Sequence, residues 1–233
     1  MPWVKPRFIN IARFAPLIGL LIGSIQACIW LFLNALNWSN TSSALLVIAL
    51  GSYITGGLHL DGLMDTADGL AAGKDRCLDA MKDSSVGASG VMLLAFSFFI
   101  QIGALIKLGD IAPYALIVSS FWGRCAPLWA IRNFPYIQSK SGSSGFHKLN
   151  WQGWKETIPA ITIIIISLLV IAILPSLGIK KAIYFTFLLI GIIPSFLIPH
   201  LIGMRLKGHT GDSYGASLVI TESINLLILG ILF

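Results

Sequence analysis

Charged residues are scarce in this chain of 233 residues. Only 11% of them are Asp, Glu, Lys or Arg, whereas 56% are hydrophobic. Soluble domains carry about 25% charged residues, and apolar runs close to the length of a bilayer span are typical of membrane proteins. The shortage of charge therefore excludes an ordinary soluble domain and indicates an integral membrane protein.

Cysteine is also sparse. Cys28, Cys77 and Cys125 lie far apart and form no CxxC pair, which excludes a disulfide framework and a cysteine zinc site. The formal net charge of +6 is the kind of excess that cytoplasmic loops of membrane proteins carry, so we expect no nucleic-acid partner. The first apolar run lacks a small-residue cleavage site, which favours a retained span over a signal peptide.

Apolar runs predict an all-α, polytopic membrane protein with about seven transmembrane helices. We expect residues 1–233 to form a single membrane-embedded domain, since no internal repeat or second composition type is present. Three long polar connections separate the runs. The predicted spans are 14–36, 43–60, 89–109, 112–131, 157–177, 182–203 and 216–233.

Basic residues predict the orientation in the membrane. If the N-terminus is inside, twelve Lys and Arg side chains fall on the inner side and three on the outer side. Such a bias is typical of the cytoplasmic face. The polar connections 61–88, 132–156 and 204–215 then all face the cytoplasm, including the acidic motif within 56–88.

The few acids are concentrated in one segment. Six of the ten lie between Asp61 and Asp83, and Asp61, Asp65 and Asp68 have i, i+4, i+7 spacing, which places them on one face of a helix. Like charges at this spacing repel each other, so a bound divalent cation is expected, and carboxylate ligands suit Mg²⁺, Mn²⁺ or Ca²⁺. A solvated acidic loop with flexible glycines is the alternative. The predicted metal ligands are Asp61, Asp65, Asp68, Asp79 and Asp83.

Other polar residues near this segment are candidates for substrate chemistry. His59 precedes the first acid and is a candidate general base, a hydrogen-bond partner for a carboxylate, or a packed histidine. Asp61 and Asp65 are candidate catalytic residues as well as metal ligands. Arg76 and Lys82 either bind phosphate groups or serve as anchors at the inner face of the membrane and as partners of the nearby acids.

Two further sites are predicted outside the acidic segment. Arg124 lies inside a predicted span, where a cation needs a partner or a cavity; contact with a substrate phosphate, a pair with Glu222 and snorkelling are all open. Thr210 and Asp212 precede the last span. Both are candidate substrate-binding residues, and Asp212 either caps that helix or makes a further contact with a metal or with substrate.

Part of the acidic pattern resembles the signature of CDP-alcohol phosphotransferases. Asp65, Asp68, Gly69, Asp79 and Asp83 follow its D-x2-D-G and D-x3-D pattern. The Ala-Arg that normally follows the glycine is replaced by Leu-Ala. These enzymes use carboxylate-held metals to transfer a phosphoryl-linked group, which is the chemistry that a metal bridging phosphate oxygens supports.

Longer motifs are more specific, and they resemble the cobalamin synthase family. The chain carries GGLHLDGLMDTADG from residue 56, DRCLDAMKDSSVGASG from residue 75 and KGHTGDSYGA from residue 207, in the family's order, followed by Glu222. Two departures exist: the N-terminal segment is shorter than usual in the family, and Val219 replaces the first of two late acids.

The resemblance implies a reaction. Adenosylcobinamide-GDP and α-ribazole, or its 5′-phosphate, give adenosylcobalamin, or its phosphate, with release of GMP and a requirement for Mg²⁺. It also implies the prokaryotic plasma (inner) membrane and contact with other cobalamin-assembly enzymes. Rival interpretations are a CDP-alcohol or prenyl-type membrane transferase and a cation transporter, although transporter acids usually lie in mid-span.

Overall fold

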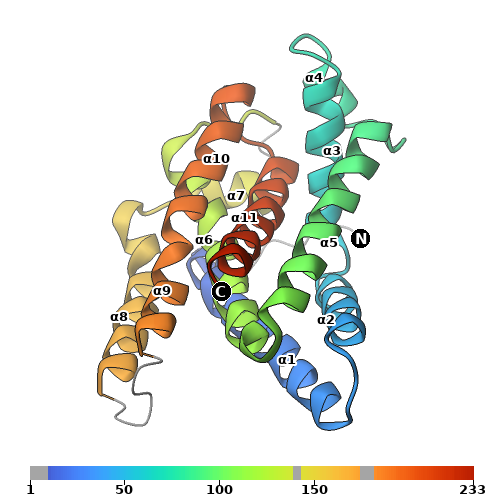
Figure 1. The fold of residues 1–233 in the computed structure, drawn as a ribbon. Helices are drawn as coiled ribbons and strands as arrows, with labels where there is room; N and C mark the ends of the chain where they lie inside the picture. Colours follow the sequence, from blue (N-terminus) through green and yellow to red (C-terminus); the bar gives the residue numbers. More distant parts are fainter. Residues whose placement is uncertain (1–9, 139–142, 174–180) are drawn as a thin grey trace.

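The computed structural model describes residues 10–138, 143–173 and 181–233, and within these ranges the chain is helical, with a single isolated bridge between Tyr136 and His209 (Figure 1). The α-helical class predicted from the sequence is therefore confirmed. The elements are η1 (Ile11–Phe14), α1 (Ala15–Ala35), α2 (Asn40–Ile54), α3 (Leu58–Ala71), α4 (Cys77–Ala80), α5 (Ala88–Leu108), η2 (Gly109–Ile111), α6 (Ala112–Asn133), α7 (Ser143–Leu149), η3 (Gly153–Thr157), α8 (Ile158–Ile173), α9 (Lys181–Ile190), α10 (Ile192–Leu206) and α11 (Gly211–Leu232).

The last helix, α11, is the centre of the fold. It packs against α3, α5, α6 and α10, and most of its side chains are buried (Figure 1). Its apolar half joins the largest core cluster, which includes Trp30, Leu105, Phe187 and Leu229. A helix that is buried on nearly all sides holds its polar side chains away from lipid, so α11 is suited to carry interior polar groups.

Other helices keep apolar side chains at the surface. Ile161, Ile165 and Leu169 of α8 are all exposed, at a spacing that places them along one side of the helix. A soluble protein rarely exposes so continuous an apolar face, whereas lipid covers it at no cost. The exposed side of α8 therefore agrees with a membrane-embedded protein.

The predicted number of spans is not confirmed. By length and composition, five helical segments among the residues searched are able to cross a membrane, or six if the bent pair α2–α3 is one span. The expected span 43–60 is interrupted because α2 ends at Ile54 and the chain turns by 90° before α3. Gly56 and Gly57 make this turn with φ of 61° and 72°, a region that glycine adopts without strain.

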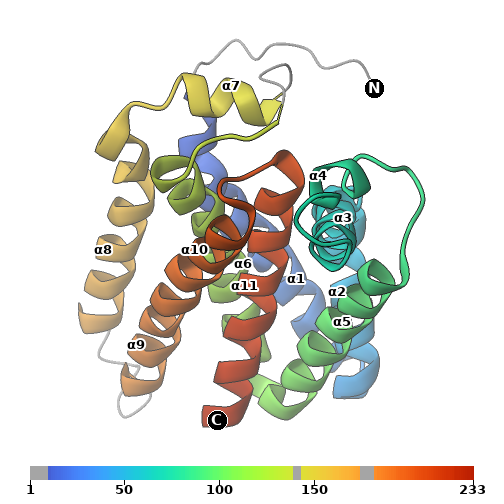
Figure 2. The same ribbon diagram turned by 90° about the horizontal axis from the view of Figure 1, so that it is seen from above.

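The long polar connections meet at one end of the molecule. Figure 2 shows α7, the start of α11 and the α3–α4 segment toward one end, and the C-terminus and α9 toward the other. Backbone bonds from Ile137 N to His209 O and from His209 N to Pro135 O join two of the connections. An ion pair between Arg13 and Glu156 ties the N-terminal segment to the same end.

Candidate functional site

Glycines bring the acidic helix α3 against the start of α11. A Cβ added at Gly62 would lie 2.6 Å from the backbone oxygen of Asp212, and one at Gly215 would lie 3.3 Å from His59 Cα. Only glycine permits the first of these approaches without displacement. The motif around residues 56–69 and the motif around 207–216 therefore form one site, with His59 and Asp212 on facing elements.

Gly62→Ala tests this approach. We expect the variant to lose about 1–3 kcal/mol of stability, because the added methyl group forces α3 away from the Asp212 backbone. Gly103→Ala, within α5, is the matched control, since nothing lies within 4 Å of its added Cβ. Thermal unfolding in detergent measures both. Equal melting temperatures for the two variants would contradict the proposed close contact.

Asp68 joins α3 to the start of α5. Its two carboxylate oxygens accept hydrogen bonds from the backbone N–H groups of Gly87 and Gly90, each 2.8 Å away. A Cβ at Gly87 or Gly90 would approach the same carboxylate within 2.4 or 2.5 Å. Asp68, one of the predicted metal ligands, therefore has a structural role in capping α5, and the first two sequence motifs meet at its carboxylate.

Asp61, Asp65 and Asp212 form the acidic part of the site. The charges of Asp61, Asp212 and Asp68 all act on half-buried Asp65, while Asp61 is exposed. The two ion pairs found in the described ranges, Arg13–Glu156 and Arg124–Glu222, do not involve these carboxylates. The acidic group is thus not neutralised by a basic side chain of the described structure.

The donor chemistry of this group fits Mg²⁺. Carboxylate oxygens are the ligands that this ion prefers, and it is commonly held by one or two carboxylates together with substrate phosphates. Over the residues that the structure describes, no three His, Cys, Asp or Glu side chains are grouped closely enough to hold a metal unaided. The five-aspartate ligand set therefore stays a prediction, and a site completed by substrate phosphate is the arrangement that the donors favour.

An open cavity lies beside Asp68 and the α4 segment. It has a volume of about 340 Å³, and Asp68, Arg76, Asp79 and Asp83 line it. The backbone N–H and the hydroxyl of Ser85 donate to Asp83 Oδ1 and hold the pKa of that carboxyl below its usual value. Arg76 thus shares this cavity with three predicted metal ligands, and its binding of phosphate stays a prediction. Exposed Lys82 does not share this cavity.

A large cavity of the described structure lies between α3, α6 and α11. Its volume is about 540 Å³, within the range of small-molecule sites. Asp212 Oδ2 accepts a hydrogen bond of 3.3 Å from Gln138 Nε2 at its edge. Polar and aromatic groups on its wall are His59, Arg124, Tyr136, Gln138, His147, Asp212 and Tyr214. One cavity thus contains three of the predicted site residues: His59, Arg124 and Asp212.

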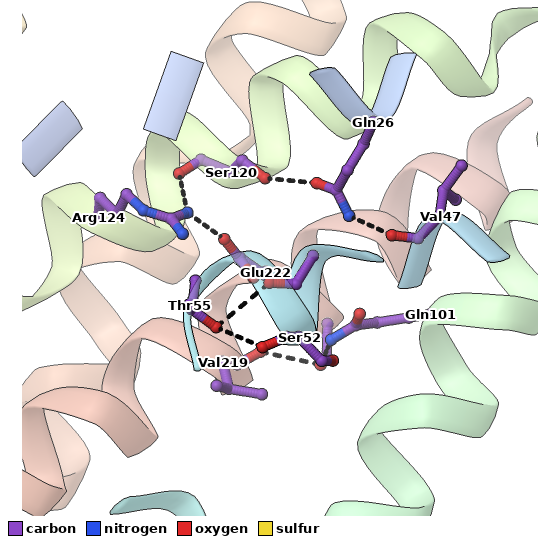
Figure 3. Close-up of polar contacts among 11 residues, drawn as sticks. Gln26, Val47, Ser52, Thr55, Gln101, Ser120, Arg124, Val219 and Glu222 are labelled. Carbon is purple, nitrogen blue, oxygen red and sulfur yellow. Dashed lines mark hydrogen bonds and ion pairs between the residues drawn. The ribbon is translucent and has the colours of Figure 1, made fainter. Parts of the chain in front are cut away.

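Arg124 is paired inside the protein. Its guanidinium donates to Glu222 Oε1 at 2.7 Å and to the Ser120 carbonyl at 3.1 Å (Figure 3). A polar chain continues from the Ser120 hydroxyl to Gln26 and from Gln26 to the Val47 carbonyl. The pair with Glu222 that the sequence left open is therefore present, and Arg124 lines the large cavity as well.

A small polar cavity of about 50 Å³ adjoins this pair, and His59, Arg124 and Glu222 all line it. His59 thus has one side toward the buried ion pair and the other toward the large cavity. The sequence could have identified Gln26 and Gln101 as interior polar residues, because amides inside apolar spans usually face the protein interior. It contained no local signal for Tyr136 or Gln138.

Thr210, and not Asp212, caps α11. Its Oγ1 accepts from Ser213 N at 3.1 Å, and Ser213 Oγ accepts from Thr210 N at 2.8 Å, which is a reciprocal capping box. Thr210 is fully buried. The cap that the sequence analysis placed at Asp212 is therefore formed by Thr210 instead. Contact with substrate stays a prediction for Asp212, which faces the cavity.

His209 is a structural residue that the sequence analysis did not identify. Its ring is fully buried, with Nδ1 2.8 Å from Ser213 Oγ and Nε2 3.0 Å from the Pro199 carbonyl. Burial lowers its pKa to about 4, so the ring is neutral at pH 7. It links the middle of α10 to the cap of α11 and so fixes the motif that carries Asp212.

Comparisons with known proteins agree with the arrangement of these motifs. A family model described as cobalamin-5-phosphate synthase matches residues 1–230. A protein of Prochlorococcus marinus (strain MIT 9303) named adenosylcobinamide-GDP ribazoletransferase is 52% identical over 99% of this chain and 90% of its own length. A protein of the same name from P. marinus (strain MIT 9313) is 50% identical over 99% of this chain and 90% of its own length. Another of that name, from Trichormus variabilis, is 34% identical over 100% of this chain and 92% of its own length. No solved structure matches.

Proposed function

The chain belongs to the cobalamin-5-phosphate synthase family, and from this premise we propose that its reaction takes place where α3 meets the start of α11. The protein is a membrane transferase that moves the adenosylcobinamide-phosphate moiety of adenosylcobinamide-GDP to α-ribazole or its 5′-phosphate. Adenosylcobalamin or its phosphate is formed and GMP is released. The contact between His59 and the Gly215 backbone is the observation that carries the location, because it joins two family motifs at one cavity.

The reaction requires an alcohol to attack phosphorus. A hydroxyl oxygen of α-ribazole forms a bond to the phosphorus that carries the cobinamide, and the bridging P–O bond to GMP breaks. The large cavity between α3, α6 and α11 has the size and the aromatic wall to hold a nucleoside such as α-ribazole, with Tyr136 and Tyr214 beside Asp212. His59, on the same wall, is placed to accept the hydroxyl proton.

Asp61 and Asp65 hold the pyrophosphate end of the site. We assign them, with Asp212 near them, to the binding of Mg²⁺ and phosphate oxygens; the ion would neutralise charge on the departing phosphate. Arg76, in the neighbouring cavity with Asp79 and Asp83, supplies a guanidinium whose planar fork suits phosphate oxygens. Asp68 holds α3 and α5 in register for this contact.

The plasma membrane is the proposed location, with the site on its cytoplasmic face and the N-terminus inside. The support is the excess of Lys and Arg in the connections that meet at the site end of the molecule. Other cobalamin-assembly enzymes are proposed as partners at that face, on the basis of the family alone.

A direct assay tests the function. Purified protein in detergent, given adenosylcobinamide-GDP, α-ribazole and Mg²⁺, should release GMP and form the cobalamin in equal amounts. Chelation of Mg²⁺ should stop both. Folded protein that forms neither product would contradict the assignment.

His59→Ala tests the proposed base. We expect kcat to fall by about a hundredfold or more, with a smaller change in KM, since a positioned general base contributes 10²–10⁴-fold. His200→Ala is the matched control, because His200 lies exposed on α10 and is not on the cavity wall. If kcat is reduced equally in the two variants, His59 is not the base.

A further inference from the structure

A basic cavity lies on a different part of α3 from the acidic site. It has a volume of about 440 Å³ and lies between the end of α10 and the segment from α3 to α4. Lys74 comes from the turn after α3, and Arg205 and Lys207 come from the end of α10.

The charges in this cavity are not neutralised by neighbouring acids. Across the described ranges, neither ion pair includes Lys74, Arg205 or Lys207. Asp75 is the one carboxylate on the cavity wall, so three cations outnumber one acid. A cavity with this excess of positive charge suits an anionic group such as a phosphate diester.

The remaining walls are apolar and lead to the lipid-facing surface. Leu70, Leu78 and Leu206 line the cavity. Below it, Leu197, Leu201 and Met204 are exposed at i, i+4, i+7 spacing along one side of α10. An acyl chain can lie along this stripe while the headgroup of the same molecule lies among the cations. A soluble phosphate has no acyl chain and would not contact this apolar stripe.

We infer that the cavity between α10 and the α3–α4 segment binds the headgroup of an anionic phospholipid, with Lys74, Arg205 and Lys207 around its phosphate. The lipid links α10 to the turn that follows the acidic helix. Bound there, it restrains the end of α3 on the side away from the large cavity. The inference does not depend on the transfer reaction, only on the location in a membrane.

Lipid binding to the full-length protein tests the inference. In native mass spectrometry of protein in detergent, phosphatidylglycerol and phosphatidylcholine are added at equal concentration. We expect phosphatidylglycerol to be retained at least about fivefold better. Arg205→Gln/Lys207→Gln should reduce its retention by about 25-fold, or about fivefold for each cation removed, and Lys74→Gln, on the other wall, by about fivefold.

Arg132→Gln/Lys155→Gln is the matched control, because it removes the same charge from exposed positions at the same end of the molecule. It should change retention by less than about twofold. Equal losses in the two double variants, or no preference for phosphatidylglycerol in the wild type, would overturn the inference. Displacement of the lipid by millimolar inorganic phosphate would also overturn it, in favour of a soluble phosphate ligand. Lys74→Gln keeps the test decisive if the double variant does not fold.

Discussion

Asp65→Asn is expected to lower the rate of GMP release by at least about a hundredfold while leaving the protein folded. Asp65 lies at the centre of the acidic group, where the charges of Asp61, Asp68 and Asp212 act on it. In the proposed site the amide would remove a negative charge that binds Mg²⁺ beside the phosphates, and the loss of one such electrostatic group typically costs 10²–10³-fold in rate. The volume of the side chain is unchanged, so packing on α11 should persist.

The measurement is kcat at saturating substrates over a series of Mg²⁺ concentrations. Asp110→Asn, in η2 between α5 and α6, is the control and should retain wild-type activity. We also expect Asp61→Asn to lose transfer. Near-normal turnover by purified Asp65→Asn would refute the proposed metal-binding role and leave the acids as a solvated surface.

Arg124→Gln is expected to destabilise the protein by about 3–5 kcal/mol. The side chains of Arg124 and Glu222 are only 6% and 19% exposed, so the substitution leaves a buried carboxylate without its cation. Glu222→Gln should cost a similar amount for the converse reason. The double variant Arg124→Met/Glu222→Leu should recover most of the loss, because replacing both charges by apolar groups of similar volume is often neutral.

Reversible unfolding in mixed micelles gives the double-mutant cycle. Single variants within about 1 kcal/mol of wild type would show that the pair contributes little. The activity of the double variant separates two roles: a stable but inactive protein indicates that Arg124 also contacts substrate in the large cavity. A stable and active one indicates that the pair serves structure alone.

The acidic motif shows how far sequence reasoning reached. Spacing placed Asp61, Asp65 and Asp68 on one helical face, and α3 is indeed a helix through all three residues. Spacing gave no sign that Asp68 has a different role from Asp61 and Asp65, because its hydrogen-bond partners Gly87 and Gly90 lie 19 and 22 residues away in the sequence. Only the turn that returns α5 alongside α3 gives that carboxylate its bonds to the start of α5.

The span count shows a different limit. An apolar run indicates the length of a hydrophobic segment but not whether its helix is straight. The sequence therefore did not reveal the 90° turn at the end of the run from 43 to 60. Gly56 and Gly57 were visible as a pair of glycines, but their left-handed conformation depends on α3 packing against α11. The two glycines therefore indicated where the helix was able to break, and the packing of α3 against α11 required the break.

Composition and motif order alone established an α-helical membrane protein with a carboxylate-rich site of one family, because hydrophobic length, charge bias and residue spacing are properties of the linear chain. The tertiary structure decided which carboxylates face a cavity, that Arg124 pairs with Glu222, and that Thr210 caps α11. The first two depend on contacts between residues far apart in the chain, 98 positions for Arg124 and Glu222, whereas the Thr210 cap is a local bond with Ser213. The long-range contacts are not encoded in any short stretch of sequence, since they arise only when distant helices pack together.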